Sequence, residues 1–337
     1  MTGGAKPVVS FDGTFRGLFD IYETDPESSY CGLKGHSRQS YDCYLAMMRV
    51  EIGHCHIDET DGSDFRQWFR AWSANNIHLA KAHMCLAIIK AALVFAMTAR
   101  KPGCADLLEI LKATKKKLPG LKPRESYITF RGVNALRKAA HKLGHPGAAL
   151  AYALQFEADQ RQLDIIGQWV RLEEPTPLTD IAVKSKKWYG AHWSMVKNNV
   201  LEMTPSKTEK TTGKKIVAPF GEYPMVIEEL KHPCHAKRKG PLIINARTGL
   251  PYRADQWNDL WREACEIVGI DSKVNWNRDL RASGITEGDE ADANIGDQAT
   301  QAGHNPLTTK RTYIRGHRAV TRVAEARRAY RRRQDQT

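Results

Sequence analysis

A short cationic segment divides the chain into two folding units. Residues 115–124 read Lys-Lys-Lys-Leu-Pro-Gly-Leu-Lys-Pro-Arg, so prolines, a glycine and repeated cations replace the hydrophobic periodicity found on either side. This composition is typical of an exposed connection between domains, and a chain of 337 residues is long enough for two cores. The expected parts are a tail (1–12), a helical domain (13–118), a linker (119–126), a second domain (127–316) and a basic tail (317–337).

The charge balance indicates a polyanionic partner. Lysine and arginine number 51 against 38 aspartate and glutamate residues, which gives a formal net charge of +13. Such an excess favours association with nucleic acid over an acidic small-molecule substrate. A merely soluble basic surface would carry the same charge, so the partner has to be inferred from the residues that carry chemistry.

Other features of the composition predict an intracellular protein. The first seven residues are polar rather than a secretory signal, and the apolar run 84–98 carries Lys90 and is too short to span a bilayer. Seven scattered cysteines suit a reducing compartment, and the Cys and His residues between 31 and 56 lack the paired spacing of a structural zinc site. We therefore expect a cytoplasmic protein with no membrane contact, bound metal or cofactor.

The first domain shows four helical stretches. Apolar residues recur at helical spacing over 41–52 and again over 65–72, where Asp61 and Ser63 are start signals. The stretch 79–97 is apolar almost all round, which predicts the buried central helix of a small bundle. A fourth helix is expected over 105–117.

The second domain is expected to be mainly helical with a small β-sheet. One interruption of the helical pattern stands out, where residues 199–203 and 215–218 flank a polar segment, as the strands of a β-hairpin would. Seven arginines lie between residues 318 and 333 with a single acidic residue among them, which predicts a basic tail that can be helical.

The second domain also contains the groups that strand transfer at a phosphodiester requires. Without a metal, this reaction needs a nucleophile, cations to hold the charge of the nonbridging oxygens, and an acid that protonates the departing 5′ oxygen. In chain order the candidates are Arg161, Lys207, Arg278, Arg281, His304 and Tyr313. Each residue alone is more often a surface cation, a helix-end histidine or a half-buried aromatic. Their order and spacing together are what indicate the reaction.

The order and spacing resemble the catalytic domain of the tyrosine recombinases, the phage integrase family. The similarity covers residues 127–316, and the helical segment before it is similar in size and position to the core-binding domain of that family. The most specific piece is residues 302–315, Ala-Gly-His-Asn-Pro-Leu-Thr-Thr-Lys-Arg-Thr-Tyr-Ile-Arg, which resembles the family's Gly-His to Tyr box throughout.

The resemblance implies a role for each residue. Tyr313 would be the nucleophile that joins the 3′ phosphate, Arg161 and Arg281 would hold the nonbridging oxygens, and His304 would donate to the phosphate. Lys207 would be the general acid, chosen over Lys210, Lys214 and Lys215 because it precedes Thr208 in a family-like Lys-Thr pair. Asp164 matches an acidic position of the family and is expected to orient a catalytic side chain.

Arg278 departs from the family, which usually has histidine three residues before the second clamp arginine. Arginine has no acceptor lone pair and cannot take the tyrosine proton. We considered two roles: a third cation at the scissile phosphate, with His304 or water taking the proton, or a contact to a neighbouring phosphate.

The resemblance implies a site-specific recombinase that acts on double-stranded DNA sites as a homotetramer. Its further implied partners are accessory DNA-bending or directionality proteins, and the basic tail is the candidate for exchange between protomers. Two alternatives stay open. A type IB topoisomerase would use the same chemistry to relax supercoils, and an integrase-derived DNA-binding protein would no longer cut. Retention of Tyr313, Lys207 and two arginines argues against the second alternative.

Overall fold

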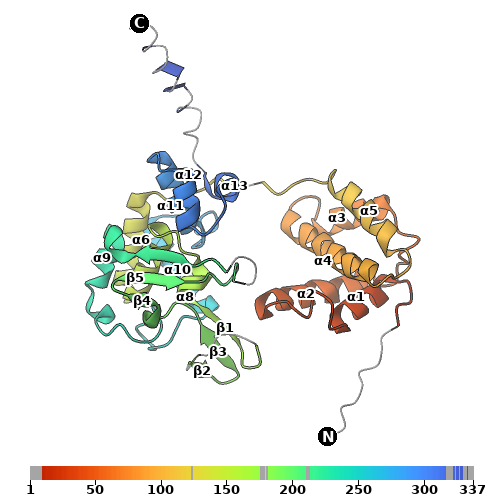
Figure 1. The fold of residues 1–337 in the computed structure, drawn as a ribbon, viewed down its shortest axis with the longest axis horizontal. Coiled ribbons are helices and arrows are strands. Elements are labelled where there is room, and N and C mark those ends of the chain that lie inside the picture. The colour runs from red at the N-terminus through yellow and green to blue at the C-terminus, as the bar shows by residue number, and fades with distance from the viewer. Residues whose placement is uncertain are drawn as a thin grey trace. The chain divides into compact units, whose positions relative to one another are not determined.

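The chain folds into two compact units, Met1–Lys122 and Pro123–Thr337 (Figure 1). The computed structural model describes residues 10–122, 124–174, 179, 181–209 and 213–315, and six positions of the tail, 322, 324, 325, 327, 328 and 332. The described tail residues are helical, and the rest of the predicted basic tail lies outside the described residues.

The first unit is a bundle of helices around α4. Its helices are α1 (Phe15–Thr24), α2 (Gly35–Glu51), α3 (Gly62–Trp72), α4 (Leu79–Thr98) and α5 (Cys104–Lys115). α4 packs against the other four, which confirms the predicted central helix. It is the one helix in the described part of the chain whose length and composition would suit a membrane span, and its contacts within the bundle account for that apolar character.

The expectation of four helices was wrong, because α1 adds a fifth. Thr14 caps this helix by accepting a hydrogen bond from the Gly17 amide at 3.1 Å. Phe15, Leu18 and Phe19 are fully buried, at the spacing of one helix face. The cap and the spacing were therefore present in the sequence, in a stretch shorter than the helices that follow it.

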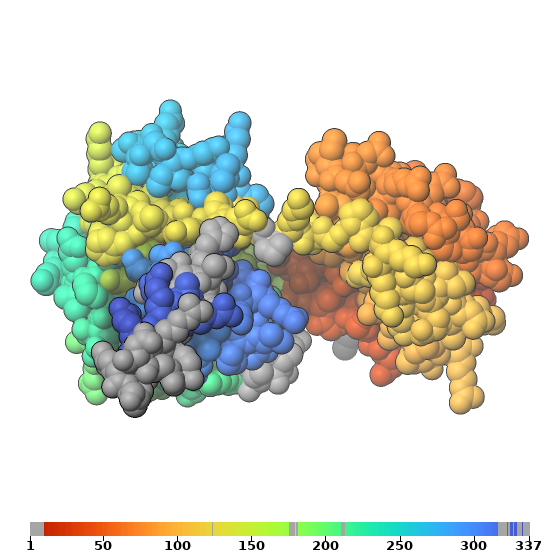
Figure 2. Space-filling view, turned by 90° about the horizontal axis from the view of Figure 1, so that it is seen from above, coloured from red at the N-terminus to blue at the C-terminus, as the bar shows by residue number. Residues whose placement is uncertain are grey.

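The second unit is built around α7. Its helices are α6 (Phe130–Lys142), α7 (Pro146–Phe156), α8 (Gln162–Ile166), α9 (Pro224–Leu230), α10 (Ala254–Val268), α11 (Asp279–Glu290), α12 (Ile295–Gln301) and α13 (Pro306–Thr308). Shorter turns are η1 (Trp193–Met195), η2 (Phe220–Glu222), η3 (Pro233–His235) and η4 (Thr309–Tyr313). α6 and α10 lie side by side, and Figure 2 shows them in yellow and light blue on the surface.

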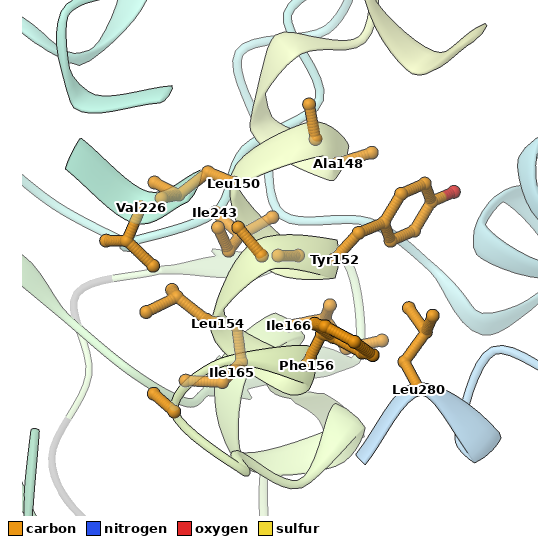
Figure 3. Packing of buried hydrophobic residues seen from close by; sticks show 14 of the residues in the cluster. Ala148, Leu150, Tyr152, Leu154, Phe156, Ile165, Ile166, Val226, Ile243 and Leu280 are labelled. Atoms are coloured by element: carbon orange, nitrogen blue, oxygen red, sulfur yellow. The ribbon is translucent and has the colours of Figure 1, made fainter. Parts of the chain in front are cut away.

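Every residue of α7 is buried, because other elements of the unit surround it. It packs against α6, α8, α9 and α11. Figure 3 shows Tyr152 and Phe156 of α7 among side chains of the neighbouring elements, including Leu280 of α11. Small residues allow this close approach: a Cβ at Gly147 would lie 2.5 Å from the carbonyl oxygen of Ile244. α7 thereby fixes α11, which carries Arg281, and α8, which begins directly after Arg161.

The strands form two antiparallel sheets of three strands each. The strands are β1 (Gln168–Arg171), β2 (Ala182–Val183), β3 (Lys186–Tyr189), β4 (Val196–Lys197), β5 (Val200–Met203) and β6 (Ile216–Pro219). The predicted hairpin is confirmed by the pairing of β5 with β6, in which Met203 lies opposite Ile216. The expectation of one interruption was wrong, because β1, β3 and β2 form a second sheet. Its strands are short and mostly half-buried, so they lack the apolar alternation that reveals a strand.

Candidate active site

The two candidate arginines approach the same loop from different helices. Arg281 lies in the first turn of α11, and its side chain is 4% exposed. Its Nη2 donates to the carbonyl oxygen of Ala302 and lies 2.6 Å from His304 Nε2. Arg161 precedes α8 as its N-cap residue, and its Nη2 lies 3.5 Å from the carbonyl oxygen of Gly303. The loop after α12 therefore brings together residues that are far apart in sequence.

Gly303 shapes this loop, because its backbone takes a conformation that side chains disfavour. With φ at +61° it ends α12, while the amides of Gly303 and His304 donate to the carbonyl oxygens of Thr300 and Ala299. This hydrogen-bond pattern is a Schellman motif, in which glycine occupies the left-handed position. A Cβ would also lie 3.0 Å from Ile216 of β6. The Gly-His pair thus ends the helix and turns His304 toward Arg281.

Tyr313 lies against both His304 and Arg281. It ends η4, a π-helical turn, which is a rare geometry that occurs frequently at functional sites. The rings of Tyr313 and His304 stack with centroids 4.3 Å apart and planes 24° apart. The guanidinium carbon of Arg281 lies 5.3 Å from the centre of the Tyr313 ring. The tyrosine is therefore next to a buried cation.

His304 is a neutral hydrogen-bond donor in this arrangement. Burial lowers its pKa to about 3, helped by the charges of Arg281, Arg161 and Lys207. Because Arg281 can only donate, His304 Nε2 accepts and the imidazole proton lies on Nδ1. This Nδ1 is buried and has no hydrogen-bond partner among the described residues. It can donate to a ligand, but it cannot take a proton from Tyr313.

Two further buried donors are unpaired in the same place. Arg281 Nε and Arg161 Nη1 have no hydrogen-bond partner within the described part of the chain. The ion pair between Arg161 and Asp164 is long, with 3.8 Å between Arg161 Nη1 and Asp164 Oδ2. Burial, together with the charge of Arg161, lowers the pKa of Arg281 to about 10, so Arg281 remains a cation at neutral pH. Buried donors usually have partners, and an oxyanion would supply them here.

Asp164 connects the Arg161 turn to the hairpin that carries Lys207. Its Oδ1 accepts from the Ser206 amide at 3.0 Å and from Ser206 Oγ at 2.6 Å. The next residue, Lys207, is exposed, and its charge is near enough to help lower the pKa of His304. Asp164 therefore restrains the base of the turn while the Lys207 side chain stays in solvent. Lys210, the alternative general acid, lies outside the described residues.

Arg278 makes different contacts from the other candidates. Its guanidinium carbon lies 4.1 Å from the centre of the exposed Trp276 ring, and that of Arg124 lies 4.3 Å from the same ring. Burial lowers its pKa, and the charges that act on it are those of Asp279, Arg124 and Arg315. The structure thus places Arg161, Arg281, His304 and Tyr313 in one cluster with Lys207 near it. Arg278 belongs to a neighbouring arginine group.

The sequence did not indicate any role for Asp159 in this cluster. Its side chain is buried, its φ is +52°, and its Oδ2 accepts from Gln301 Nε2 at 2.9 Å. Burial raises its pKa to about 8, although the charge of Arg281 opposes the shift. Only the fold brings it near Arg281, and its proximity to Arg161 in sequence gave no sign of this. Among the described residues, no group of three His, Cys, Asp or Glu side chains is placed to hold a metal ion.

Comparison with known proteins identifies the fold. No protein-family model matches the chain, and no curated protein matches its sequence. Solved structures do match, with low sequence identity. A lambda integrase fragment dimer bound to a COC′ core site has a TM-score of 0.65 and 15% identity over 90% of this chain and 97% of that chain.

Two further structures agree. A lambda integrase tetramer bound to a Holliday junction gives a TM-score of 0.64 and 16% identity over 90% of this chain and 78% of that chain. A Tn1549 transposon integrase in complex with transposon right end DNA gives 0.65 and 14% identity over 94% and 99%. Both integrases are tyrosine recombinases, and this chain has their fold. The predicted fold class, a helical core-binding domain followed by a tyrosine recombinase catalytic domain, is confirmed.

Proposed function

We propose that this protein is a site-specific DNA recombinase that cuts and rejoins strands through a phosphotyrosine bond at Tyr313. The observation that carries the proposal is the set of buried donors beside this tyrosine: Arg161 Nη1, Arg281 Nε and His304 Nδ1 have no hydrogen-bond partner among the described residues. A phosphodiester has two nonbridging oxygens that can accept from them. Guanidinium groups suit this task, because they are always charged and donate as a planar fork.

Cleavage exchanges one phosphoester bond for another. The Tyr313 hydroxyl oxygen bonds to phosphorus, and the bond between phosphorus and the 5′ oxygen breaks. The tyrosine proton passes to water, because His304 holds its own proton on Nδ1 and accepts from Arg281 at Nε2. Lys207 gives a proton to the departing 5′ oxygen. Religation is the reverse of these steps, so the phosphodiester energy is retained and no step draws on a metal ion or ATP.

We propose that Asp164 positions both ends of this reaction. It accepts two hydrogen bonds from Ser206, next to Lys207, and lies 3.8 Å from Arg161. A mobile amine on a fixed turn can follow the leaving oxygen, which suits a general acid. For Arg278, the position over Trp276 favours the second of its two considered roles, a contact to a neighbouring phosphate.

The proposed partners are two duplex DNA sites and further copies of this chain. The matched structures include a lambda integrase dimer on a core site and a tetramer on a Holliday junction, which supports a tetramer on DNA. We extend the proposal to accessory DNA-bending or directionality proteins, to exchange of the basic tail between protomers, and to a cytoplasmic location associated with the nucleoid. Integration or excision of a mobile element is the proposed use.

The test is a covalent adduct on nicked duplexes tiled across the DNA that flanks the gene of this protein. The wild-type chain should shift a labelled strand on a denaturing gel, and Tyr313→Phe should abolish the shift while DNA binding stays nearly intact. Recombination between two sites would separate a recombinase from a topoisomerase, which would only relax supercoils. Absence of any adduct with the wild-type chain would favour the non-cutting alternative, and an adduct in Tyr313→Phe would place the nucleophile elsewhere.

A further inference from the structure

The main chain on either side of Ile314 is attached to α11 through one hydroxyl. Thr286 is fully buried, and its Oγ1 lies 3.0 Å from the Tyr313 carbonyl oxygen and 3.1 Å from the Arg315 amide nitrogen. It also lies 2.7 Å from the carbonyl oxygen of Ala282, one turn earlier in the helix. A hydroxyl can accept from the amide while its single proton is directed to one of the two carbonyl groups. Thr286 thus bridges the residues before and after Ile314.

An ion pair holds the same segment from the other side. Arg315 Nη2 donates to Asp279 Oδ1 at 3.0 Å, and Arg315 Nη1 donates to the Ser126 carbonyl oxygen at 2.6 Å. The side chains of Asp279 and Arg315 are 2% and 9% exposed. Asp279 Oδ2 accepts from the Trp276 amide at 2.8 Å and from Arg124 Nη2 at 2.6 Å, so the carboxylate is itself held in place. Arg315 is therefore attached to a rigid point at the start of α11.

Thr286 contacts main-chain groups of Tyr313 and Arg315, and Asp279 contacts the Arg315 side chain. None of these contacts involves the Tyr313 ring, which stacks on His304. On the other side of the tyrosine, the Ile314 amide donates to the Thr309 carbonyl oxygen at 3.2 Å and closes the π turn. The nucleophile is thus bounded by a turn before it and by an anchor directly after it. Beyond Arg315 the chain continues into the basic tail.

We propose that Thr286 and Arg315 are positioning residues that fix Tyr313 to α11 of its own chain, so that the tyrosine stays in place whatever the basic tail contacts. This inference rests on the proposed function and deepens it. Its physical basis is that a reacting atom must be held close to its attack geometry, since a displacement of about 1 Å can cost about a hundredfold in rate. Thr286 and Arg315 are not among the proposed donors to the phosphate, so their proposed role is one of position.

The first test compares Thr286→Val, which keeps the shape and removes the hydroxyl, with Thr286→Ser, which keeps the hydroxyl. A matched control is Ser283→Ala on the same helix: its hydroxyl is also buried, but it contacts the Ile128 amide at 2.9 Å and the Asp279 carbonyl at 2.8 Å. Hydrogen exchange followed by mass spectrometry on the full free chain should show exchange in residues 309–315 accelerated by up to about tenfold in Thr286→Val. Thr286→Ser and Ser283→Ala should leave this segment unchanged.

The second measurement is single-turnover adduct formation on the nicked duplex that the wild-type chain cuts. Thr286→Val should slow it by at least about tenfold with DNA affinity unchanged, because the loss is one of position and not of binding. Thr286→Ser should restore the rate. Equal rates in Thr286→Val and wild type, or equal slowing in Ser283→Ala, would overturn the proposal.

Arg315→Lys is the second variant, for the case that Thr286→Val fails to fold. Lysine keeps the charge toward Asp279 but cannot donate to the Ser126 carbonyl at the same time with a planar fork. It should accelerate exchange in residues 309–315 and slow adduct formation, and no change in either would reject the role of Arg315. The exchange measurement needs no cleavage. If the wild-type chain never cuts DNA, the proposed function is refuted, and hydrogen exchange still shows whether Thr286 and Arg315 hold residues 309–315.

Discussion

Two arginines of the second unit are equally buried and have opposite surroundings. Arg137 and Arg281 are each 4% exposed. Arg137 donates to Glu229 at 2.7 Å, to Glu228 at 2.8 Å and to Asn134 at 2.6 Å. Arg281 contacts the carbonyl oxygen of Ala302 and His304 Nε2, and no carboxylate of the described residues forms an ion pair with it. An arginine with a complete set of hydrogen-bond partners stabilises the fold, whereas an arginine with an incomplete set has donors left for an anion.

The largest expected effect comes from removing the arginine with the incomplete set. Arg281→Ala should lower single-turnover cleavage by about a thousandfold, as loss of a preorganised oxyanion donor does, with little loss of stability. Adduct formation and thermal melting measured on the same preparation would check both. If Arg281→Ala loses stability but cleaves normally when folded, then Arg281 has a structural role like that of Arg137.

Removing the fully paired arginine should reverse this pattern. Arg137→Ala leaves the 2% exposed Glu229 carboxylate without its guanidinium and should destabilise the fold by about 3–5 kcal/mol. Urea denaturation would measure the loss. Cleavage per folded molecule should stay near the wild-type value, and a specific loss of cleavage would end the contrast between the two arginines.

Lys207 extends the comparison to a cation that is exposed to solvent. Lys207→Ala should slow cleavage of ordinary DNA by about a hundredfold, which is the range of general acid catalysis. Cleavage should recover on a substrate with sulfur at the 5′ bridging position, because a thiolate departs without a proton. Failure to recover would reject the role, and recovery in Lys210→Ala would reassign it.

Arg278 differs from both buried arginines, because its guanidinium group lies over the indole of Trp276. If Arg278 contacts a neighbouring phosphate, Arg278→Ala should lower the affinity of the protein for DNA by about tenfold. The slope of log affinity against log salt concentration should fall in magnitude by about 1. Salt titrations of binding would measure both, with Lys273→Ala, an exposed cation in the preceding turn, as the control. A cleavage rate that falls far more than affinity, and returns in Arg278→His, would instead place Arg278 at the scissile phosphate.

The smallest effect should come from raising the pH until Asp159, which lies near Arg281, loses its proton. Asp159 has a folded-state pKa of about 8, so above this pH its charge should weaken anion binding at Arg281. Asp159→Asn should therefore exceed the wild-type cleavage rate by roughly threefold at pH 9 and match it at pH 7. A constant ratio across this range would disconnect Asp159 from the site.

The same shift predicts a pH dependence of stability with a definite sign. The pKa of Asp159 is raised from 3.8 to about 8, so between these values the folded state binds more protons than the unfolded state. Its contribution to stability is then lost as pH rises through that window. Urea denaturation at several pH values should show a shallower loss in Asp159→Asn than in wild type.

What the sequence could predict was local chemistry. The Gly303-His304 pair needs glycine because the backbone ends a helix there and passes close to Ile216. Such a local requirement can be recognised from the sequence. The same is true of the hairpin around Lys207. The sequence could not show that Asp159 lies near Arg281 or that Thr286 holds the segment after Tyr313. These relations depend on how α7, α11 and α12 pack, and no local pattern records that packing.

Short elements and residues that depart from the family pattern were also hard to interpret from the sequence. The sheet of β1, β2 and β3 has strands of two to four residues, too few for an alternating pattern. Arg278 was predicted among the catalytic residues from its spacing, and that role stays a prediction; the spacing did not indicate its contact with the Trp276 indole or the nearby arginines. Spacing locates a position in a motif, and the side chain that occupies it decides what it contacts.

The apolar character of α4 has a consequence for how the protein is made. While a ribosome synthesises the chain, α4 emerges before α5, the last of the helices that cover it. Translation proceeds at about 5–20 residues per second, so the stretch from the end of α4 to the end of α5 follows within about one to four seconds. During that interval a nascent helix resembling a membrane segment is accessible to chaperones and targeting factors. The bundle is complete before the residues around Tyr313 have been translated.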